Sequence, residues 1–301
     1  MTTRAEGEEA RARSKRPAGW IAPGPRPRGA DGRSELAPSE EEDLSYLTGD
    51  FRIFQRKRGH RWSLDDFVTA LVAIEEARAL EAARGAPLAR AVDLGCGIGS
   101  VLMMVAWGLP TIASTGIEAQ ELSFGLAQRS LAYNGLDERV RVLLGDLREV
   151  ALTLPAGSIE LVTGTPPYIP LGSGLVSDKD QRGPACFEIR GGVEDYARAA
   201  AHLVAPGGRF VTCLGAQPET RGEDAVRTAG LVPLRRVDVI PKAGKPVLLR
   251  VVVAARADDP AAVAARGEVA IEPFVVRDEH ARVTPQMEAA RVVMGLPPST
   301  T

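Results

Sequence analysis

The chain has few of the residues that form disulfides or hold metal ions. Only three of its 301 residues are cysteines and only three are histidines. Cys96, Cys186 and Cys213 lie far apart and form no Cys-x-x-Cys pair. We therefore expect neither a disulfide framework nor a bound metal, and this composition fits a reducing compartment.

The sequence also lacks an excess of charge and a long hydrophobic run. Its formal net charge is -2, so affinity for a polyanion would have to come from a local basic patch. The uncharged run 101–117 is interrupted by Gly108 and Pro110, which is typical of a helix, a turn and a strand rather than a membrane span. The N-terminus has no apolar signal region. We expect a soluble cytoplasmic protein with no membrane contact.

The first third of the chain divides into a tail and a short structured segment. Residues 1–43 are rich in charge and proline and offer almost nothing to bury, so we expect a disordered tail. Residues 44–90 are expected to form short strands and one helix. Ser63 has the character of an N-cap because two acids follow it, and the apolar periodicity then continues to about Arg84.

Apolar strands alternate with amphipathic helices in residues 91–256. This order is typical of an α/β fold with a mostly parallel sheet that is covered by helices on both faces. The expected strands are 91–94, 114–118, 141–144, 159–164 and 208–214. The expected helices are 100–107, 119–134, 147–152, 193–203 and 219–229. Two further runs, 231–240 and 247–255, are expected to pair as an antiparallel hairpin, and 257–301 to form a C-terminal extension.

A glycine-rich turn is expected between the first strand of the sheet and its helix. In Asp93-Leu-Gly-Cys-Gly-Ile-Gly99, glycines permit positive φ and let a ligand approach the backbone. Ser100 stands where a dinucleotide fingerprint has its last glycine, which suits a cofactor without a pyrophosphate. Glu118, at the end of the next strand, has a carboxylate suited to ribose hydroxyls. Asp93 would favour a cationic ligand group, so the sequence predicts a nucleoside site.

These residues resemble the cofactor site of the class I S-adenosylmethionine-dependent methyltransferases. The resemblance implies a Rossmann-like fold with a seven-stranded sheet. It also implies that Gly95, Cys96 and Gly97 pass the methionine part of the cofactor and that Glu118 binds its ribose. Asp146 would then meet the adenine amine, although it is equally suited to capping the helix that follows.

A second motif follows the fourth strand, where Thr165-Pro-Pro-Tyr168 ends an apolar run. Proline holds the residue before it in an extended conformation, so this corner is stiff. It resembles the Asn/Asp/Ser-Pro-Pro-Tyr/Phe/Trp motif of methyltransferases that modify a planar nitrogen. That resemblance implies that Thr165 and the Pro166 carbonyl position the amine, that Pro167 stiffens the corner, and that Tyr168 stacks on the acceptor. Thr165 departs from the motif, because a hydroxyl is a shorter and weaker acceptor than an amide or a carboxylate.

Two families compete for the substrate. Gly59-His-Arg-Trp-Ser-Leu-Asp65, Val276-Arg-Asp-Glu279 and Val283-Thr-Pro285 resemble the bacterial tRNA1(Val) adenine-N6-methyltransferases. Phe187-Glu188 and Gly191-Gly192, with Tyr196 downstream of the proline corner, resemble the protein glutamine methyltransferases of the release-factor type. The glutamine enzymes usually carry an N-terminal helical domain, for which residues 1–90 have little room, so the adenine interpretation is preferred.

A basic run supplies candidate contacts to tRNA, the expected partner. The predicted substrate-binding residues are Arg56, Lys57, Arg58 and Arg61. Cationic side chains of this kind contact phosphates, but a solvated edge explains them as well. Methylation of a protein glutamine or of a small molecule stays open. A third possibility also stays open, a non-catalytic protein that binds the cofactor and RNA, because Thr165 departs from the catalytic motif.

Overall fold

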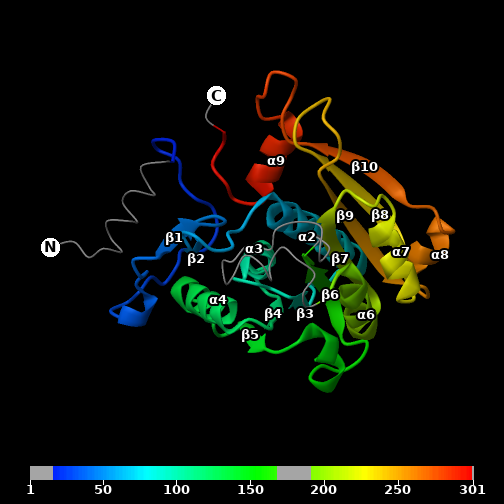
Figure 1. The fold of residues 1–301 in the computed structure, drawn as a ribbon, viewed down its shortest axis with the longest axis horizontal. Helices are drawn as coiled ribbons and strands as arrows, with labels where there is room; N and C mark the ends of the chain where they lie inside the picture. Colours follow the sequence, from blue (N-terminus) through cyan, green and yellow to red (C-terminus); the bar gives the residue numbers. More distant parts are fainter. Residues whose placement is uncertain (1–15, 168–190, 300–301) are drawn as a thin grey trace.

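An eight-stranded sheet forms the centre of the molecule in a computed structural model that describes residues 16–167 and 191–299 (Figure 1). The strand order is β10-β8-β9-β7-β6-β3-β4-β5. The strands are β3 (Arg90–Leu94), β4 (Ala113–Glu118), β5 (Val140–Leu144), β6 (Ile159–Gly164), β7 (Val204–Gly215), β8 (Leu231–Ile240), β9 (Leu249–Arg256) and β10 (Ala270–Val275). Only β9 is antiparallel to its neighbours, β7 and β8. The predicted parallel sheet with its hairpin is confirmed, and β10, parallel to β8, was not predicted.

Helices cover both faces of this sheet. They are α2 (Leu64–Arg84), α3 (Ser100–Gly108), α4 (Glu121–Asn134), α6 (Val193–Leu203), α7 (Arg221–Thr228), α8 (Pro260–Ala265) and α9 (Pro285–Val293). Two 3-10 helices, η1 (Ser34–Leu36) and η2 (Leu147–Leu152), complete the set. Two clusters of buried apolar side chains pack these helices against the sheet. Helices α2, α3 and α4 contribute to the first cluster, and α6 and α7 contribute to the second. In the described part of the chain, no helix has both the length and the apolar character that a membrane crossing needs.

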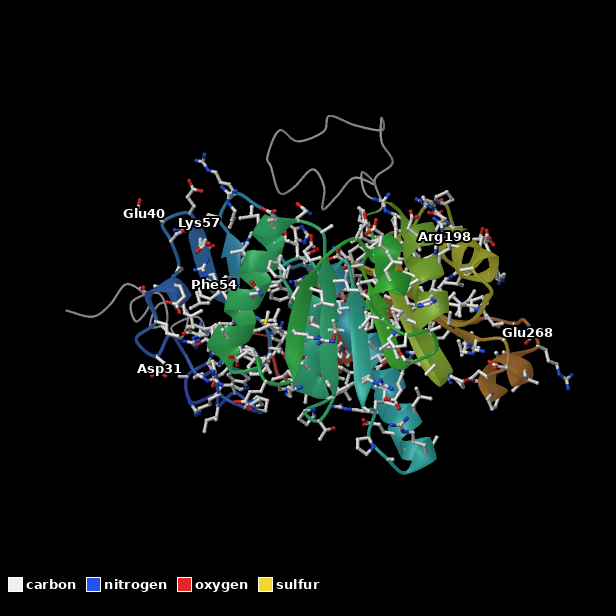
Figure 2. The ribbon with its side chains drawn as sticks, turned by 90° about the horizontal axis from the view of Figure 1, so that it is seen from below. Asp31, Glu40, Phe54, Lys57, Arg198 and Glu268 are labelled. Atoms are coloured by element: carbon white, nitrogen blue, oxygen red, sulfur yellow. The ribbon has the colours of Figure 1, made fainter. Side chains whose placement is uncertain are left out.

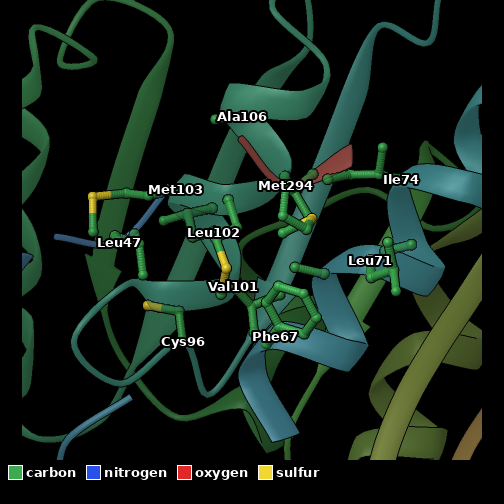
Figure 3. Close-up of a cluster of buried hydrophobic side chains, with 14 of the residues drawn as sticks. Leu47, Phe67, Leu71, Ile74, Cys96, Val101, Leu102, Met103, Ala106 and Met294 are labelled. Carbon is green, nitrogen blue, oxygen red and sulfur yellow. The ribbon is translucent and has the colours of Figure 1, made fainter. Parts of the chain in front are cut away.

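Helix α3 lies at the centre of the larger cluster (Figure 3). Its side chains Leu102, Met103 and Ala106 are fully or almost fully buried. A helix that is apolar on every side has to be surrounded by other elements. Helix α2 supplies Phe67 to this surrounding shell, and Met294 comes from the end of α9, so the C-terminal segment closes the same core.

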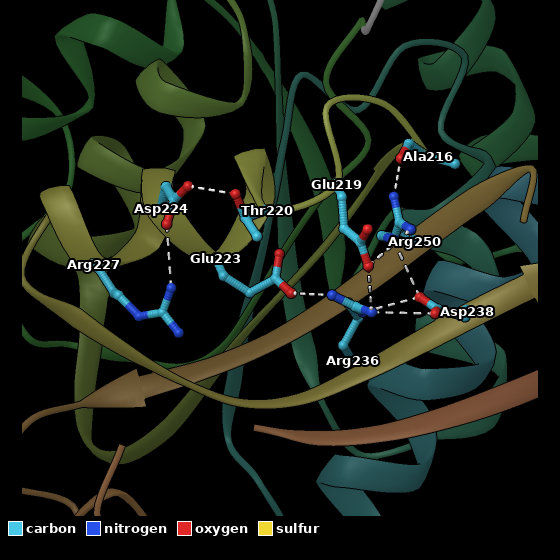
Figure 4. Close-up of polar contacts among 9 residues, drawn as sticks. All are labelled: Ala216, Glu219, Thr220, Glu223, Asp224, Arg227, Arg236, Asp238 and Arg250. Atoms are coloured by element: carbon cyan, nitrogen blue, oxygen red, sulfur yellow. Dashed lines mark hydrogen bonds and ion pairs between the residues drawn. The ribbon is translucent and has the colours of Figure 1, made fainter. Parts of the chain in front are cut away.

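Residues 257–299 extend this domain on two sides. They supply β10 to the edge of the sheet and α9 to the large apolar cluster. Next to this edge, Arg236 on β8 is buried beside Glu223 of α7 and Asp238 (Figure 4). Arg250 on β9 bonds the same Asp238. Buried charges need such partners to offset their desolvation, so this network fixes the hairpin against α7.

Residues 1–43 were expected to be disordered, but the structure shows residues 16–43 packed onto the domain. Strand β1 (Glu42–Tyr46) pairs antiparallel with β2 (Arg52–Arg56), and Leu36 is only 2% exposed. Arg129 of α4 holds this segment through an ion pair with Glu42 at 2.8 Å. A contact between residues so far apart in the chain, such as Arg129 with Glu42, cannot be predicted from the local composition of residues 1–43. Residues 1–15 lie outside the described residues.

Three glycines from separate segments make room for one side chain, Trp107. A Cβ on Gly24 or on Gly49 would stand 2.6 Å from the indole nitrogen, and one on Gly295 would stand 2.5 Å from the ring. The backbone N–H of Gly49 also donates to the Gly295 carbonyl at 3.1 Å. The indole therefore joins the N-terminal segment, the β1–β2 turn and the C-terminal segment, and each of these glycines is required by packing.

Replacing Gly295 with alanine should test this junction. Its φ is +61°, and the added methyl would also overlap the Trp107 ring. Gly207→Ala is the matched control, since its φ is +75° but no atom lies within 4 Å of the new Cβ. We expect Gly295→Ala to lower the free energy of unfolding by about 1–3 kcal/mol more than the control, in urea titrations. Equal losses in the two variants would show that Trp107 does not join these segments.

Candidate active site

The candidate site lies where strands β3, β4 and β6 end. These strands are parallel neighbours, so their carboxyl ends meet at one edge of the sheet. A cavity of about 490 Å³ opens there. Most of the residues that the sequence singled out line it: Lys57, Arg58, Arg61, Gly95, Cys96, Gly97, Glu118, Asp146, Thr165, Pro166 and Pro167. Asp93 and Arg56 are not in its lining, and Tyr168 lies outside the described residues.

The glycine turn presents bare backbone to the cavity. Gly95, Gly97 and Gly99 all have positive φ, at 59°, 55° and 85°. No heavy atom lies within 4 Å of the place that a Cβ on Gly97 would take, so the backbone there faces open space. Helix α3 begins directly after Gly99, and its first N–H groups lie near the turn.

Glu118 is held at the end of β4 by the backbone around it. Its Oε2 accepts from the Gly97 N–H at 2.8 Å, and its Oε1 accepts from the Gln120 N–H at 2.7 Å. The side chain is 5% exposed and lines the cavity. A carboxylate offers about four acceptor positions, which suits Glu118 to bind donors of a ligand as well as backbone N–H groups. The residue is thus oriented in advance for a ligand that carries hydroxyl groups.

Tyr196 of α6 links the glycine turn to the proline corner. A Cβ on Gly95 would overlap the Tyr196 hydroxyl, and one on Gly164 would stand 2.6 Å from its ring. The side chain is 6% exposed, and burial raises the pKa of its hydroxyl far above the ordinary value. Tyr196 is therefore a neutral side chain that packs against both the glycine turn and the last residue of β6. The sequence places Tyr196 downstream of the proline corner, but nothing local indicates which strand ends a helix residue will meet.

Asp93 lies behind the cavity wall instead of facing the cavity. It is 3% exposed, and its Oδ1 accepts from the Thr163 hydroxyl at 2.7 Å, across the β3–β6 pair. Burial raises the pKa of Asp93 to about 7, against the lowering effect of the Thr163 hydrogen bond. Near neutral pH this group is partly protonated. Its predicted contact with a cationic ligand group stays a prediction.

A second buried acid, Asp66, does line the cavity. Its Oδ1 accepts from the Ser100 hydroxyl at 2.9 Å, and its Oδ2 accepts from the Ser63 N–H at 2.9 Å. Burial raises the pKa of Asp66 to about 8, and the charge of Asp65 adds to this shift. The spacing of Ser63 and Asp66 in the sequence predicts a capping box at the start of α2. It does not predict that the start of α2 lies against the start of α3.

Asp146 enters the cavity with a cation already beside it. It is the N-cap of η2 and accepts from the backbone N–H of Arg148 at 2.9 Å. The Arg148 guanidinium bonds both carboxylate oxygens, with Nε 2.9 Å from Oδ1 and Nη2 2.5 Å from Oδ2. The capping role is therefore present. A role towards a base amine stays a prediction, since that amine would share the carboxylate with Arg148.

The predicted basic run is partly neutralised by the acidic segment before it. Arg56 pairs with Glu41 at 2.8 Å, and Arg61 pairs with Asp43 at 2.6 Å. The Lys57 ammonium donates to the Glu40 carbonyl at 2.9 Å (Figure 2). Strand pairing of β1 with β2 brings the two opposite charges together. The run is therefore a weaker source of positive potential than its sequence suggests.

Comparison with known proteins relates the chain to methyltransferases. It is 34% identical over 92 residues to a release factor glutamine methyltransferase from Gloeobacter violaceus, covering 31% of each chain. It is 28% identical over 191 residues to the enzyme of that name from Deinococcus radiodurans, covering 61% of this chain and 62% of that one. It is 25% identical over 161 residues to a tRNA1(Val) adenine-N6-methyltransferase from Bacteroides fragilis, covering 52% and 65%. The chain thus spans less than two thirds of each relative.

The fold agrees with these relatives. A crystal structure of a predicted O-methyltransferase from Agrobacterium tumefaciens matches with a TM-score of 0.54 at 20% identity, covering 79% of this chain and 100% of that one. No protein-family model matches the chain. The resemblance predicted from the glycine turn and the proline corner is confirmed at this level. The chain has the class I methyltransferase fold and is related in sequence to S-adenosylmethionine-dependent methyltransferases.

Proposed function

We propose that this protein is an S-adenosylmethionine-dependent methyltransferase that acts on a conjugated nitrogen, preferably the N6 amine of an adenine in tRNA. One observation carries the proposal: the same cavity is lined by the glycine turn with Glu118 and by the Thr165-Pro-Pro167 corner. A cofactor and an acceptor group placed there would lie side by side. Placing two reactants together removes much of the entropic barrier to their reaction.

The cavity suits this cofactor in size and in chemistry. Its volume of about 490 Å³ falls in the range of small-molecule sites. The open backbone at Gly97 leaves room for the methionine part, and Glu118 has acceptor capacity for both ribose hydroxyls. Asp65 and Glu118 also line the cavity, and carboxylates there favour a ligand with cationic and donor groups. When bound, S-adenosylmethionine supplies an electrophilic methyl group.

The proline corner would position the acceptor nitrogen. Its lone pair is delocalised, so it attacks poorly unless its N–H groups are held by acceptors. The Thr165 hydroxyl and the Pro166 carbonyl would accept those two hydrogens, with Pro167 keeping the corner extended. Tyr168 is predicted to stack on the planar group. No side-chain base is needed before transfer, because the proton leaves after the new bond has formed.

An adenine in tRNA is preferred on two grounds. Arg58 and Lys57 lie on the cavity wall, where cations would meet the phosphates next to a bound base. The relative from Bacteroides fragilis is named as a tRNA adenine-N6-methyltransferase. An unpaired or flipped adenine would reach the corner.

A protein glutamine is the second candidate. The relatives from Gloeobacter violaceus and Deinococcus radiodurans are named as release factor glutamine methyltransferases, and they are more similar over their matched parts. A glutamine amide also presents a planar nitrogen with two N–H groups. The corner chemistry would thus be the same, and the acceptor has to be identified from the product.

Product analysis should decide between the candidates. The purified chain is incubated with labelled S-adenosylmethionine and either unfractionated tRNA or a protein extract, and the products are digested and identified by mass. We expect N6-methyladenosine in tRNA and no label in protein. Label in glutamine alone would replace the RNA proposal with the second candidate. A protein that binds the cofactor and labels neither substrate would contradict a catalytic role.

Thr165→Asn should increase the rate of methyl transfer. An amide oxygen is the better acceptor and reaches further than a hydroxyl, so kcat should rise by roughly five- to tenfold. Thr165→Val is the control of nearly equal volume without an acceptor, and it should lower kcat by at least as much. Single-turnover assays at saturating cofactor measure both. Unchanged rates in both variants would mean that position 165 does not touch the acceptor.

A further inference from the structure

Two loops outside the cavity lie on the same edge of the sheet as the proline corner. Strand β6 is parallel to β7, β9 is antiparallel to both β7 and β8, and β10 is parallel to β8. Strands β8 and β10 therefore run in the direction of β6. The loops 241–248 and 276–284, which follow β8 and β10, emerge at the carboxyl edge, where Thr165 follows β6.

These two loops form one folded unit. The Ala243 N–H donates to the Arg277 carbonyl at 2.8 Å, and the Val276 N–H donates to the Ile240 carbonyl at 2.9 Å. Figure 1 shows them next to each other beyond the ends of β8 and β10. Within the second loop, Asp278 accepts from the backbone N–H of Arg282 at 2.9 Å. Their side chains are thus presented from a fixed backbone.

The unit carries cations that the protein leaves available. Among the described residues, Lys242 and Lys245 form no ion pair or side-chain hydrogen bond. Arg277 is exposed, and within residues 16–167 and 191–299 its side chain donates only to the Ala281 carbonyl, at 2.7 Å. Arg282 is paired with Asp278 at 3.0 Å. The predicted run at Arg56–Arg61 differs, because acidic partners from residues 40–43 take up two of its charges.

The spacing from the corner suits a chain of phosphates. Two strands, β7 and β9, lie between β6 and β8, so three strand spacings, or about 14 Å, separate β6 from β8 across the sheet. The strand register places Gly164, at the end of β6, level with Arg236, so the end of β8 at Ile240 also lies four residues, or about 13 Å, further along the strand direction. The two strand ends are thus about 19 Å apart, and the end of β10, one spacing further, is about 23 Å from that of β6. A stacked nucleic-acid strand advances about 3.4 Å per nucleotide, so these spans correspond to roughly six to seven nucleotides. A base at Thr165 would place a later part of its strand on the loops.

We propose that Lys242, Lys245 and Arg277 form a surface that binds the RNA phosphate backbone several nucleotides away from the methylated base. This inference rests on the proposed function and names the part of the substrate that lies outside the cavity. A phosphate backbone fits better than a peptide, because the two adjoining loops offer three cations beside one exposed acid, Glu279, and no apolar pocket is needed. Short substrates that only fill the cavity gain nothing from it.

Charge reversal on the first loop tests the proposal. Lys242→Glu/Lys245→Glu is compared with Arg90→Glu/Arg266→Glu, which makes the same change of charge at two exposed positions on the opposite edge, the first residue of β3 and a residue before β10. Binding of unfractionated tRNA is measured at several salt concentrations. The loop variant should bind at least about tenfold more weakly than the control, and the slope of log K against log salt should be smaller by about two.

Two further measurements separate this effect from loss of fold or of the proposed function. Cofactor affinity, thermal unfolding and the methylation rate of the trinucleotide ApApA should be the same in both variants. Equal tRNA affinity in the loop and control variants would overturn the surface while leaving tRNA as the substrate. Failure of the wild-type protein to bind or methylate tRNA would overturn both proposals, and the product analysis would then show label elsewhere.

Discussion

The packing of one side chain, Tyr196, against two glycines is the constraint on which the site depends. Its ring and hydroxyl fill the space that Cβ atoms on Gly164 and Gly95 would take. Strands β3 and β6 are direct neighbours, so the glycine turn and the proline corner begin one strand spacing apart. A larger residue at either glycine would push α6 from the sheet and separate the two motifs. The same helix thus supports both the glycine turn and the proline corner.

The carboxyl edge carries both acids and cations. The cavity is lined by acidic groups as well as by Lys57 and Arg58, and burial keeps two of the acids at or near it, Asp66 and Asp93, protonated over a wider pH range than usual. This limits repulsion among carboxylates in one small volume while leaving Glu118 oriented by backbone donors. Outside the cavity, the free cations at Lys242 and Lys245 lie towards β8. The cations on the cavity wall and those on the loop after β8 would thus offer an anionic polymer contacts along one edge.

Most of the sheet could be predicted, because strands buried on both faces are continuous apolar runs; β6 begins and ends where the sequence placed it. The expected disorder up to residue 43 was wrong for 16–43, since distant partners such as Arg129 order that segment. Strand β10 was missed because it is an edge strand with mostly exposed residues. In the site, motifs that act through local backbone geometry were found, whereas Asp66 and Tyr196 depend on contacts between elements far apart in the chain.

The central claim is that Glu118 and the glycine turn hold S-adenosylmethionine at this edge of the sheet. Calorimetric titration of the cofactor into the wild type, Glu118→Ala and Glu121→Ala measures it most directly. Glu121 is exposed at the start of α4, three residues further along. The account predicts that the wild type and Glu121→Ala bind alike and that Glu118→Ala binds at least about tenfold more weakly, with two lost hydrogen bonds to ribose. Equal affinity of all three proteins, or no binding by the wild type, would contradict it.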